Sequence, residues 1–486
     1  MSSKKGVLKN AIVYSFSNIL LRSFNFFLLP LYTAYLSTSD YGTTNLIKNF
    51  TAVMSIVCVF STYAAVARFY ADYRDDKEES AKLFGTLITF TFFSNCAFFV
   101  LICIFRNILS EYVFKGVPFI PTVITALLGI GFGNIYSMYQ FILKGTERAK
   151  QSAITSIVYF FVMLGFNMIF VVGMKLGANG VVISTLITNI AGTLFMLLSM
   201  IKNNEIKFGI DRKILKEVLK YSIPLMPHDL STSISSLFSS AFINFSYSLS
   251  SLGLYSMACQ FGDIADTIQA SVNTAFQPWF YTQMKDKEER YQTSIQNLSY
   301  TLVWLYSAFF LGIALFAQDL IILLLNNRYR LAWKLIPLIV VSYSIKTIYY
   351  FFVNVLFYHK SASKYIFIST LASSILNVIL SAIMIPRFGT YGSVAADILT
   401  MIVRVFIIVR ISKKVDNIGY KVIKFLKITC FEIMFIVVGL FFSYTKYQEI
   451  FYVKNFLYKL VVYLIFCAFV LFSQRKNIKA LFLLKK

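Results

Sequence analysis

The sequence predicts an all-α polytopic membrane protein with about fourteen transmembrane helices. Hydrophobic residues make up 58% of the chain and charged residues only 14%, a balance that excludes an ordinary soluble domain. The apolar runs are continuous rather than alternating, which excludes a transmembrane β-barrel. Each run approaches the ~20 residues that a helix needs to cross the hydrocarbon.

The predicted spans are joined by short connections. In chain order the spans cover residues 11–36, 46–67, 83–104, 118–142, 152–173, 179–201, 219–243, 252–276, 295–318, 333–357, 364–385, 390–410, 424–443 and 457–473. Spans 46–67, 219–243 and 252–276 are rich in Ser, Gln and charged residues, so their spacing supports them more than their hydropathy does. The short connections leave little room for a soluble enzymatic domain, and any function must lie between the helices.

Segments near the start of the chain recur roughly 210 residues later. The matches are Tyr14-Ser15 with Tyr221-Ser222, Ser37 with Ser248, Gly42 with Gly253, Phe50 with Phe261, Phe69-Tyr70 with Phe280-Tyr281, Asn167 with Asn377, and Gly177 and Gly180 with Gly389 and Gly392. A nearly constant offset predicts two tandem six-helix bundles, related by an axis along the membrane normal, as in alternating-access transporters.

The repeat predicts four segments. They are an N-terminal six-helix lobe over 1–201, a basic cytoplasmic linker over 202–220, a C-terminal six-helix lobe over 221–411, and a basic segment over 412–486 that carries two further helices and a basic tail.

The formal net charge of +24 raises the question of a nucleic-acid partner, but its distribution argues against one. Lysine and arginine concentrate in alternate connections, which is the positive-inside pattern and predicts that both termini are cytoplasmic. The 202–220 linker is the densest basic segment, and we expect it to lie along anionic lipid headgroups. The first apolar run is too long for a cleavable signal peptide.

The six cysteines all fall within apolar spans and form no CxxC pair, so we expect neither a disulfide framework nor a zinc site. The only histidines are His228 and His359. We therefore expect no metal centre and no cofactor.

Several basic residues lie within predicted spans, where a charge costs roughly 2.5–3.5 kcal/mol on insertion scales. Arg22 is the deepest of them, and Lys346 is central in span 333–357. Lys48 and Arg404 lie nearer to span ends, from which long side chains can snorkel to the headgroups. All four are candidate substrate-binding residues of a cavity, with Arg22 the strongest.

The acidic residues within the repeated spans all lie in the second repeat: Asp229, Asp263, Asp266 and Asp397. Asp263 and Asp266 share a helix face, and Asp397 lies seven residues before Arg404, which it could neutralise. Asp229 is the positional counterpart of Arg22. One interpretation is structural pairing. The other is ion or proton coupling, because a buried carboxyl that changes protonation between two states couples transport to a gradient.

The seventh span begins with two prolines, Pro224 and Pro227. Each removes a helical hydrogen bond, so the helix should bend near Asp229. A broken helix at membrane depth is tolerated where it lines a cavity, which makes this segment a candidate hinge.

Several motifs resemble those of the polysaccharide-type flippases in the multidrug/oligosaccharidyl-lipid/polysaccharide exporter superfamily. They run through residues 1–411 and include Phe27-Leu28-Leu29-Pro30-Leu31-Tyr32, Asp40-Tyr41-Gly42, Arg68-Phe69-Tyr70, Tyr221-Ser222-Ile223-Pro224, Gly253-Leu254-Tyr255-Ser256 and Phe276-Gln277-Pro278-Trp279. The family often carries an Asp-Arg pair where this chain has Ser240-Ala241. Any mechanism that relies on that pair does not transfer here.

The resemblance implies a carrier rather than an enzyme. It would move an undecaprenyl-pyrophosphate-linked oligosaccharide from the cytoplasmic to the outer leaflet by alternating access, with Arg22 facing the pyrophosphate. It also implies a bacterial cytoplasmic membrane protein that serves export of a surface polysaccharide such as capsule or O-antigen. Glycosyltransferases and a polysaccharide polymerase would be its partners.

Three alternatives stay open. A multidrug and toxin extrusion exporter is favoured by the acidic residues of the second repeat and opposed by Arg22 and Lys346. A lipid II flippase would be essentially the same machine serving peptidoglycan. A membrane polymerase or ligase is disfavoured by the short connections.

Overall fold

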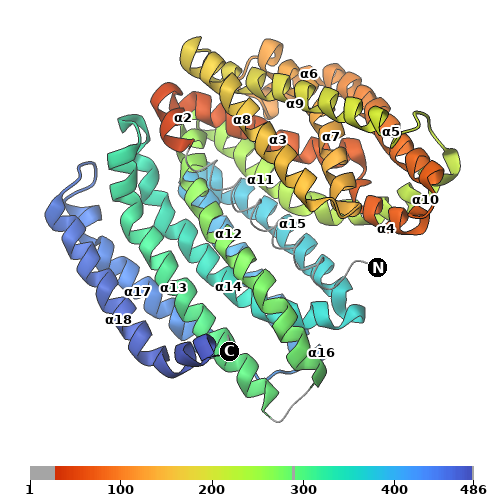
Figure 1. Cartoon of the computed structure of the whole chain (residues 1–486). Coiled ribbons are helices and arrows are strands. Elements are labelled where there is room, and N and C mark those ends of the chain that lie inside the picture. Colours follow the sequence, from red (N-terminus) through yellow and green to blue (C-terminus); the bar gives the residue numbers. More distant parts are fainter. Residues whose placement is uncertain (1–27, 287–289, 484–486) are drawn as a thin grey trace. The chain divides into compact units, whose positions relative to one another are not determined.

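The computed structural model describes residues 28–286 and 290–483, and all regular elements within these ranges are helices (Figure 1). The chain divides into two compact units, Met1–Gly253 and Leu254–Lys486. The division falls within one long helix, α12 (Leu249–Asp286). The lobes predicted at 1–201 and 221–411 follow the sequence repeat, and their boundaries stay a prediction.

The first unit contains the helices up to α11 and the start of α12. They are α2 (Leu29–Tyr35), α3 (Thr38–Val59), α4 (Tyr63–Tyr73), α5 (Lys77–Ile104), α6 (Arg106–Tyr112), η1 (Phe119–Val123), α7 (Ile124–Gly145), α8 (Ala149–Asn167), η2 (Met168–Gly173), α9 (Gly177–Lys202), α10 (Arg212–Ser222), η3 (Ile223–Leu225) and α11 (Met226–Ser246).

The second unit contains the remainder of α12 and the helices that follow it. They are α13 (Tyr291–Leu324), η4 (Asn327–Leu335), α14 (Ile336–Tyr358), η5 (Lys360–Ala362), α15 (Ser363–Phe388), α16 (Thr390–Val415), α17 (Val422–Thr445) and α18 (Val453–Leu483).

The predicted fold class is confirmed. Within the described ranges, ten helical segments are long and apolar enough to cross a membrane. Three more helices, α11, α12 and α16, occupy the predicted spans 219–243, 252–276 and 390–410 but are more polar than those ten. The first predicted span, 11–36, lies largely outside the described residues.

Several residues matched by the sequence repeat have the same local structural role in both copies. The Ser37 hydroxyl accepts a hydrogen bond from the Asp40 amide at the start of α3, and Ser248 accepts one from the Ser251 amide at the start of α12. Gly177 is the first residue of α9 and has a φ of 58°. Gly389 directly precedes α16 and has a φ of 60°. Such positive φ values favour glycine because it has no Cβ. The sequence repeat therefore reflects repeated local structure.

Gly42 and Gly253 bring the first turns of α3 and α12 into backbone contact. A Cβ atom on Gly42 would lie 1.9 Å from the Leu249 carbonyl oxygen, and one on Gly253 would lie 1.9 Å from that of Thr38. The Thr38 and Ser250 hydroxyls are hydrogen-bonded at 2.7 Å beside this crossing. Close approach through paired small residues is a common mode of helix packing in membranes.

The second predicted span is interrupted, which the sequence did not indicate. Helix α3 ends at Val59, and Phe60 and Ser61 both have φ of 52° before α4 begins at Tyr63. The Ser94 hydroxyl of α5 donates to the Cys58 carbonyl at 2.6 Å, which satisfies part of the broken helix end.

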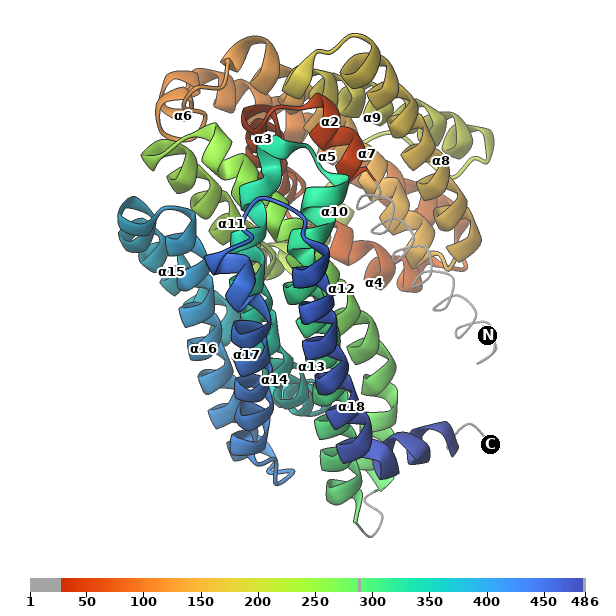
Figure 2. The same ribbon diagram turned by 90° about the vertical axis from the view of Figure 1, so that its left-hand side faces the viewer.

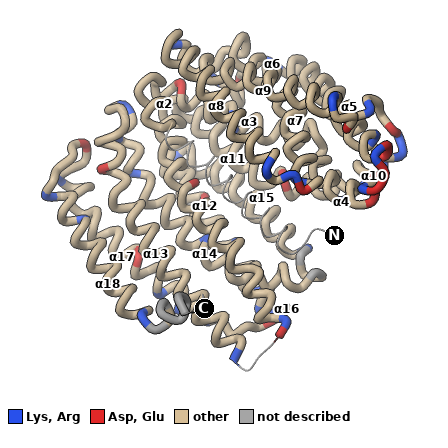
Figure 3. The backbone as a smooth tube through the Cα atoms, viewed as in Figure 1, with Lys and Arg blue, Asp and Glu red and all other residues tan. Residues whose placement is uncertain are grey.

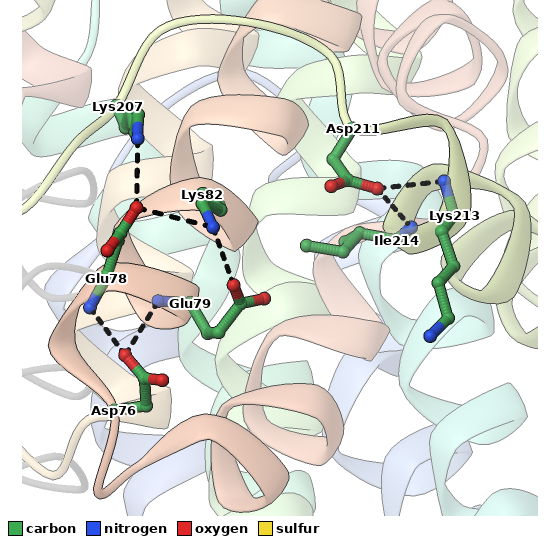
Figure 4. Close-up of polar contacts among 8 residues, drawn as sticks. All are labelled: Asp76, Glu78, Glu79, Lys82, Lys207, Asp211, Lys213 and Ile214. Atoms are coloured by element: carbon green, nitrogen blue, oxygen red, sulfur yellow. Dashed lines mark hydrogen bonds and ion pairs between the residues drawn. The ribbon is translucent and has the colours of Figure 1, made fainter.

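The connection between α9 and α10 is bound closely to α5. The Lys207 amide donates to the Ala81 carbonyl, and Lys207 Nζ lies 3.0 Å from Glu78 Oε1, which also pairs with Lys82 (Figure 4). Asp211 caps α10 by accepting from the Lys213 and Ile214 amides. Figure 3 shows charged residues crowding around α4, α5 and α10.

The two C-terminal helices, α17 and α18, pack on α13 within the second unit (Figure 2). Their connecting turn is also fixed. The Gln448 carbonyl accepts from Trp333 Nε1 at 2.9 Å, and its side chain accepts from Lys334 Nζ at 2.7 Å. The helix pair without a counterpart in the repeat is therefore built into the second unit.

Candidate functional site

Arg22, the strongest candidate from the sequence, lies outside the described residues. Its proposed role in pyrophosphate binding stays a prediction. Of the other charged candidates, Lys48 and Asp229 lie in the first unit. The second unit contains Asp263, Asp266, Lys346, Asp397 and Arg404.

Lys346 and Asp266 form an ion pair between α14 and α12. Lys346 Nζ lies 2.5 Å from Asp266 Oδ1, and the two side chains are only 21% and 32% exposed. Two tyrosines flank the ammonium group, since Nζ lies 5.3 Å from the Tyr343 ring centroid and 5.8 Å from that of Tyr350. The carboxylate and the two aromatic rings offset part of the cost of placing a lysine side chain between helices.

The same two helices make further polar contacts, which continue from this ion pair toward the C-terminal end of α12. Gln269 Nε2 donates to the Tyr343 carbonyl and to the Thr347 hydroxyl. Further along, Asn354 of α14 bonds to two residues of α12. Its Nδ2 donates to Asn273 Oδ1 at 2.8 Å, and its Oδ1 accepts from Gln277 Nε2 at 2.9 Å. We call the contacts from Asp266–Lys346 to Gln277–Asn354 the α12–α14 polar ladder.

Asp397 and Arg404 do not neutralise each other, contrary to the interpretation drawn from their spacing. Asp397 accepts from Asn377 Nδ2 at 2.8 Å and from the Tyr255 hydroxyl at 3.3 Å. The Arg404 guanidinium instead donates to the Thr370 hydroxyl at 2.8 Å and lies 4.7 Å from a tyrosine ring of α14. Neighbouring helices offer both groups partners at closer range than seven residues along one helix.

Asp229 lies at the start of α11 in the first unit. Its Oδ2 accepts from the Ser61 hydroxyl at 2.8 Å and from the Tyr63 hydroxyl at 2.6 Å. Both donors come from the interruption between α3 and α4. Two broken helices therefore meet at one carboxylate, which the sequence singled out without its partners.

The remaining candidates are more open. Lys48 is exposed on α3, which agrees with a side chain that reaches toward solvent or headgroups. Asp263 is exposed on α12, one turn before Asp266. The two therefore share a face, and Asp266 pairs with Lys346.

The helix is interrupted where the two prolines lie. Pro224 lies in the 3₁₀ turn Ile223–Leu225, and Pro227 lies in the first turn of α11. This position suits proline, which lacks the amide that the first helical turn leaves unbonded. Movement about this turn stays a prediction.

Three buried charged residues of the second unit were missed by the sequence analysis. Lys459 of α18 is fully buried, and its Nζ lies 2.5 Å from Asp319 Oδ2 of α13. Glu432 of α17 is fully buried and accepts from the Ser344 hydroxyl at 2.7 Å. Glu432 lies within the predicted span 424–443, so its depth was a usable signal. Asp319 and Lys459 lie at span ends and gave none. Among the described residues, no group of three potential metal ligands is found.

Comparison of the fold with solved structures gives matches among membrane transporters. A structure described as the lipid II flippase MurJ in an inward closed conformation matches with a TM-score of 0.73 and 17% sequence identity, over 95% of this chain and 99% of that chain. An inward-facing multidrug resistance MATE family transporter matches with a TM-score of 0.60 and 13% identity, over 80% of this chain and 93% of that chain.

A third match is a transporter of the same superfamily from Pyrococcus furiosus, with a TM-score of 0.54 and 14% identity, over 87% of this chain and 98% of that chain. At these identities the matches show a shared fold. A comparison with curated proteins gives no match.

The fold is that of solved transporters of the multidrug/oligosaccharidyl-lipid/polysaccharide exporter superfamily. The sequence profile of the polysaccharide biosynthesis protein family matches residues 7–285, more than half of the chain. The chain therefore belongs to that family.

Proposed function

We propose that this protein is a flippase for a lipid-linked oligosaccharide. It moves an undecaprenyl-pyrophosphate-linked repeat unit from the cytoplasmic to the outer leaflet by alternating access, for export of a surface polysaccharide such as capsule or O-antigen. The observation that carries the proposal is the aromatic-flanked Lys346–Asp266 pair, a sheltered cation in a polysaccharide-family transporter fold.

Physical chemistry supports such a site. The cargo has a large polar headgroup with about two negative charges on its pyrophosphate, and hydrocarbon cannot replace the water around these charges. Cations in a hydrated chamber can do so while the polyprenyl tail stays in lipid. Arg22 and Lys346 are the proposed pyrophosphate-binding residues, and Arg404 and Lys48 are secondary ones.

The acidic residues are proposed to couple transport to an ion or proton gradient. Asp229, Asp266 and Asp397 each bind partners from other helices, so a change in their ionisation would alter helix contacts. Asp263 is the fourth candidate. Pro224 and Pro227 are the proposed hinge, because Pro224 lies in the turn that leads into α11 and Pro227 lies in the first turn of that helix.

The test is a flipping assay with the full chain in proteoliposomes that contain a fluorescent lipid-linked oligosaccharide. We expect Arg22→Ala to abolish flipping with the protein still inserted, and Arg22→Lys to retain part of it. Wild-type flipping by Arg22→Ala at matched protein density would overturn this assignment of the pyrophosphate site.

We place the protein in the bacterial cytoplasmic membrane with both termini cytoplasmic. Glycosyltransferases that build the repeat unit on the inner leaflet and a polymerase that consumes it on the outer leaflet are the proposed functional partners. Loss of the flippase should leave single repeat units inside the cell, whereas loss of a polymerase leaves them outside.

A lipid II flippase is the second candidate, favoured by the fold match to a protein of that description. Depletion in the native host separates the two functions. A lipid II flippase is required for growth, whereas a repeat-unit flippase is dispensable when synthesis is blocked upstream. Drug efflux, the alternative suggested by the acidic residues, predicts instead that deletion sensitises cells to cationic drugs.

A further inference from the structure

We infer that three amide side chains of the α12–α14 polar ladder, those of Asn273, Gln277 and Asn354, recognise the hydroxyl groups of a saccharide headgroup. The inference rests on the proposed function and adds to it. It assigns the pyrophosphate and the sugars to different parts of the second unit, with Lys346 at one part and the amides at the other.

The hydrogen bonds of the three amides are arranged in a chain. Asn354 is fully buried and uses both ends of its amide, donating to Asn273 and accepting from Gln277. It therefore fixes the orientation of two side chains that are one helical turn apart on α12. An amide held at one end cannot rotate freely, so its other end points in a defined direction.

The outer amides retain hydrogen-bonding capacity. Asn273 uses its Oδ1 and Gln277 uses its Nε2, and neither the Asn273 Nδ2 donors nor the Gln277 Oε1 acceptor has a partner among the residues that the structure describes. Both residues are only partly buried. A donor and an acceptor held one helical turn apart suit sugar hydroxyls, which donate and accept at once, better than a phosphate, which accepts only.

Polar side chains on a helix of a membrane protein need polar partners, so the three amides indicate a polar contact or ligand. Helix α12 has 38 residues, yet it is not among the segments apolar enough to span a bilayer on their own. Asn273 and Asn354 lie near the ends of the predicted spans 252–276 and 333–357, and Gln277 directly follows the first of these spans. Polar groups within a span face other helices or water. Asn354 provides the helix-to-helix contact, and the half-buried outer amides remain for a hydrated ligand.

The length of the ladder allows both parts of a headgroup to bind. Asp266 and Gln277 are separated by eleven residues, which corresponds to roughly 17 Å along an α-helix. A headgroup that places its pyrophosphate at Lys346 can therefore reach the amides with its sugars. A substrate with one sugar would reach fewer of them than a substrate with several.

The test compares two fluorescent undecaprenyl-pyrophosphate lipids in the proteoliposome assay, one with a single sugar and one with a complete repeat unit. The variant is the double substitution Asn273→Leu and Gln277→Met, which keeps the side-chain shapes close to those of the wild type. Thr274→Ala, an exposed position on the same helix, is the matched control. We expect the double variant to flip the complete repeat unit about tenfold more slowly, the effect of losing two ordinary hydrogen bonds, and the single-sugar lipid with a clearly smaller loss.

Equal rates for both lipids in the double variant and the wild type would overturn the inference, and so would an equal loss for both lipids, because that pattern indicates a helix-packing role. Asn354→Leu provides a second measurement, since it frees the outer amides without removing them. It should weaken discrimination between the two lipids while the thermal unfolding midpoint reports any packing defect separately. If the wild-type protein flips neither lipid, the proposed function itself fails.

Discussion

At the scale of single residues, variants of the Lys346–Asp266 ion pair can distinguish a structural role of the pair from a role in transport. Lys346→Met leaves a half-buried carboxylate without its cation, and Lys346→Met with Asp266→Asn removes both charges. In a double-mutant cycle of thermal unfolding we expect a coupling of roughly 0.5–3 kcal/mol in favour of the pair. Flipping should stay low in the double variant although folding recovers, because the substrate still lacks its cation. Recovery of flipping with folding would assign the pair to structure alone.

Asp211 provides a prediction on pH outside the membrane spans. The Ile214 amide, followed by the Lys213 amide, donates to its carboxylate and lowers the pKa of Asp211 from the usual 3.8. A lowered folded-state pKa means that the carboxylate stabilises the start of α10 above its unfolded-state pKa. That contribution is lost as the pH falls through the folded-state value.

Hydrogen exchange of the first turn of α10 measures this effect. Asp211→Ala should exchange faster than the wild type at neutral pH, whereas Asp211→Asn should keep most of the protection, because asparagine is also a good N-cap. Protection in the wild type should fall in acid, and in Asp211→Asn it should not. A wild-type turn whose protection ignores pH would contradict the role of the charge.

For the charged candidate residues, the sequence predicted a position within a helix but not the hydrogen-bond partners of each side chain. The sequence indicated that Asp229, Asp266, Lys346, Asp397 and Arg404 lie within helices. It suggested that Asp397 could neutralise Arg404, because spacing along one helix is visible in a sequence. The observed partners Asn377 and Thr370 come from α15, and contacts between helices depend on packing that no local pattern encodes.

At the scale of helices, apolar runs and turn residues predicted most of the elements. The start of α3 was not predicted: the sequence began the second span at residue 46, whereas the helix begins at Thr38 with Ser37 as its cap. The interruption after Val59 was not predictable, because Phe60 carries no breaker signal. It is stabilised instead by contacts with α5 and α11, such as the hydrogen bond from Ser94. Tertiary contacts there outweigh local propensity.

The C-terminal helix α18 is held to α13 by a buried ion pair, which makes a quantitative prediction possible. Lys459→Met leaves Asp319 buried without a cation and should destabilise the protein by about 3–5 kcal/mol. Adding Asp319→Leu should restore most of the loss, since apolar residues of similar size replace buried pairs well. Lys454→Met, at an exposed position of α18, is the control.

Thermal unfolding of the purified protein checks this prediction. A double variant no more stable than the single one would show that Asp319 has a further partner. A single variant as stable as the control would show that the ion pair contributes nothing.

At the scale of the whole molecule, the positive-inside pattern predicts the side on which each connection lies. Lys115 and Lys207 are exposed in connections separated by three predicted spans, so they should face opposite sides. In a background without the six native cysteines, a membrane-impermeant maleimide should label Lys115→Cys in intact cells. It should label Lys207→Cys only after permeabilisation. The reverse result would invert the topology and the proposed direction of transport.

The crossing of α3 and α12 has a consequence for the origin of this chain. Gly42 contacts the residue that corresponds to Thr38, and Gly253 contacts Thr38 itself, so the two halves of the contact are copies of one another. Such an isologous contact is the kind that two identical subunits make about a dyad. A half-length ancestor with a single glycine at this position could have dimerised through the same surface. Gene duplication and fusion would then have preserved this helix–helix contact, and no new complementary residue would have been needed.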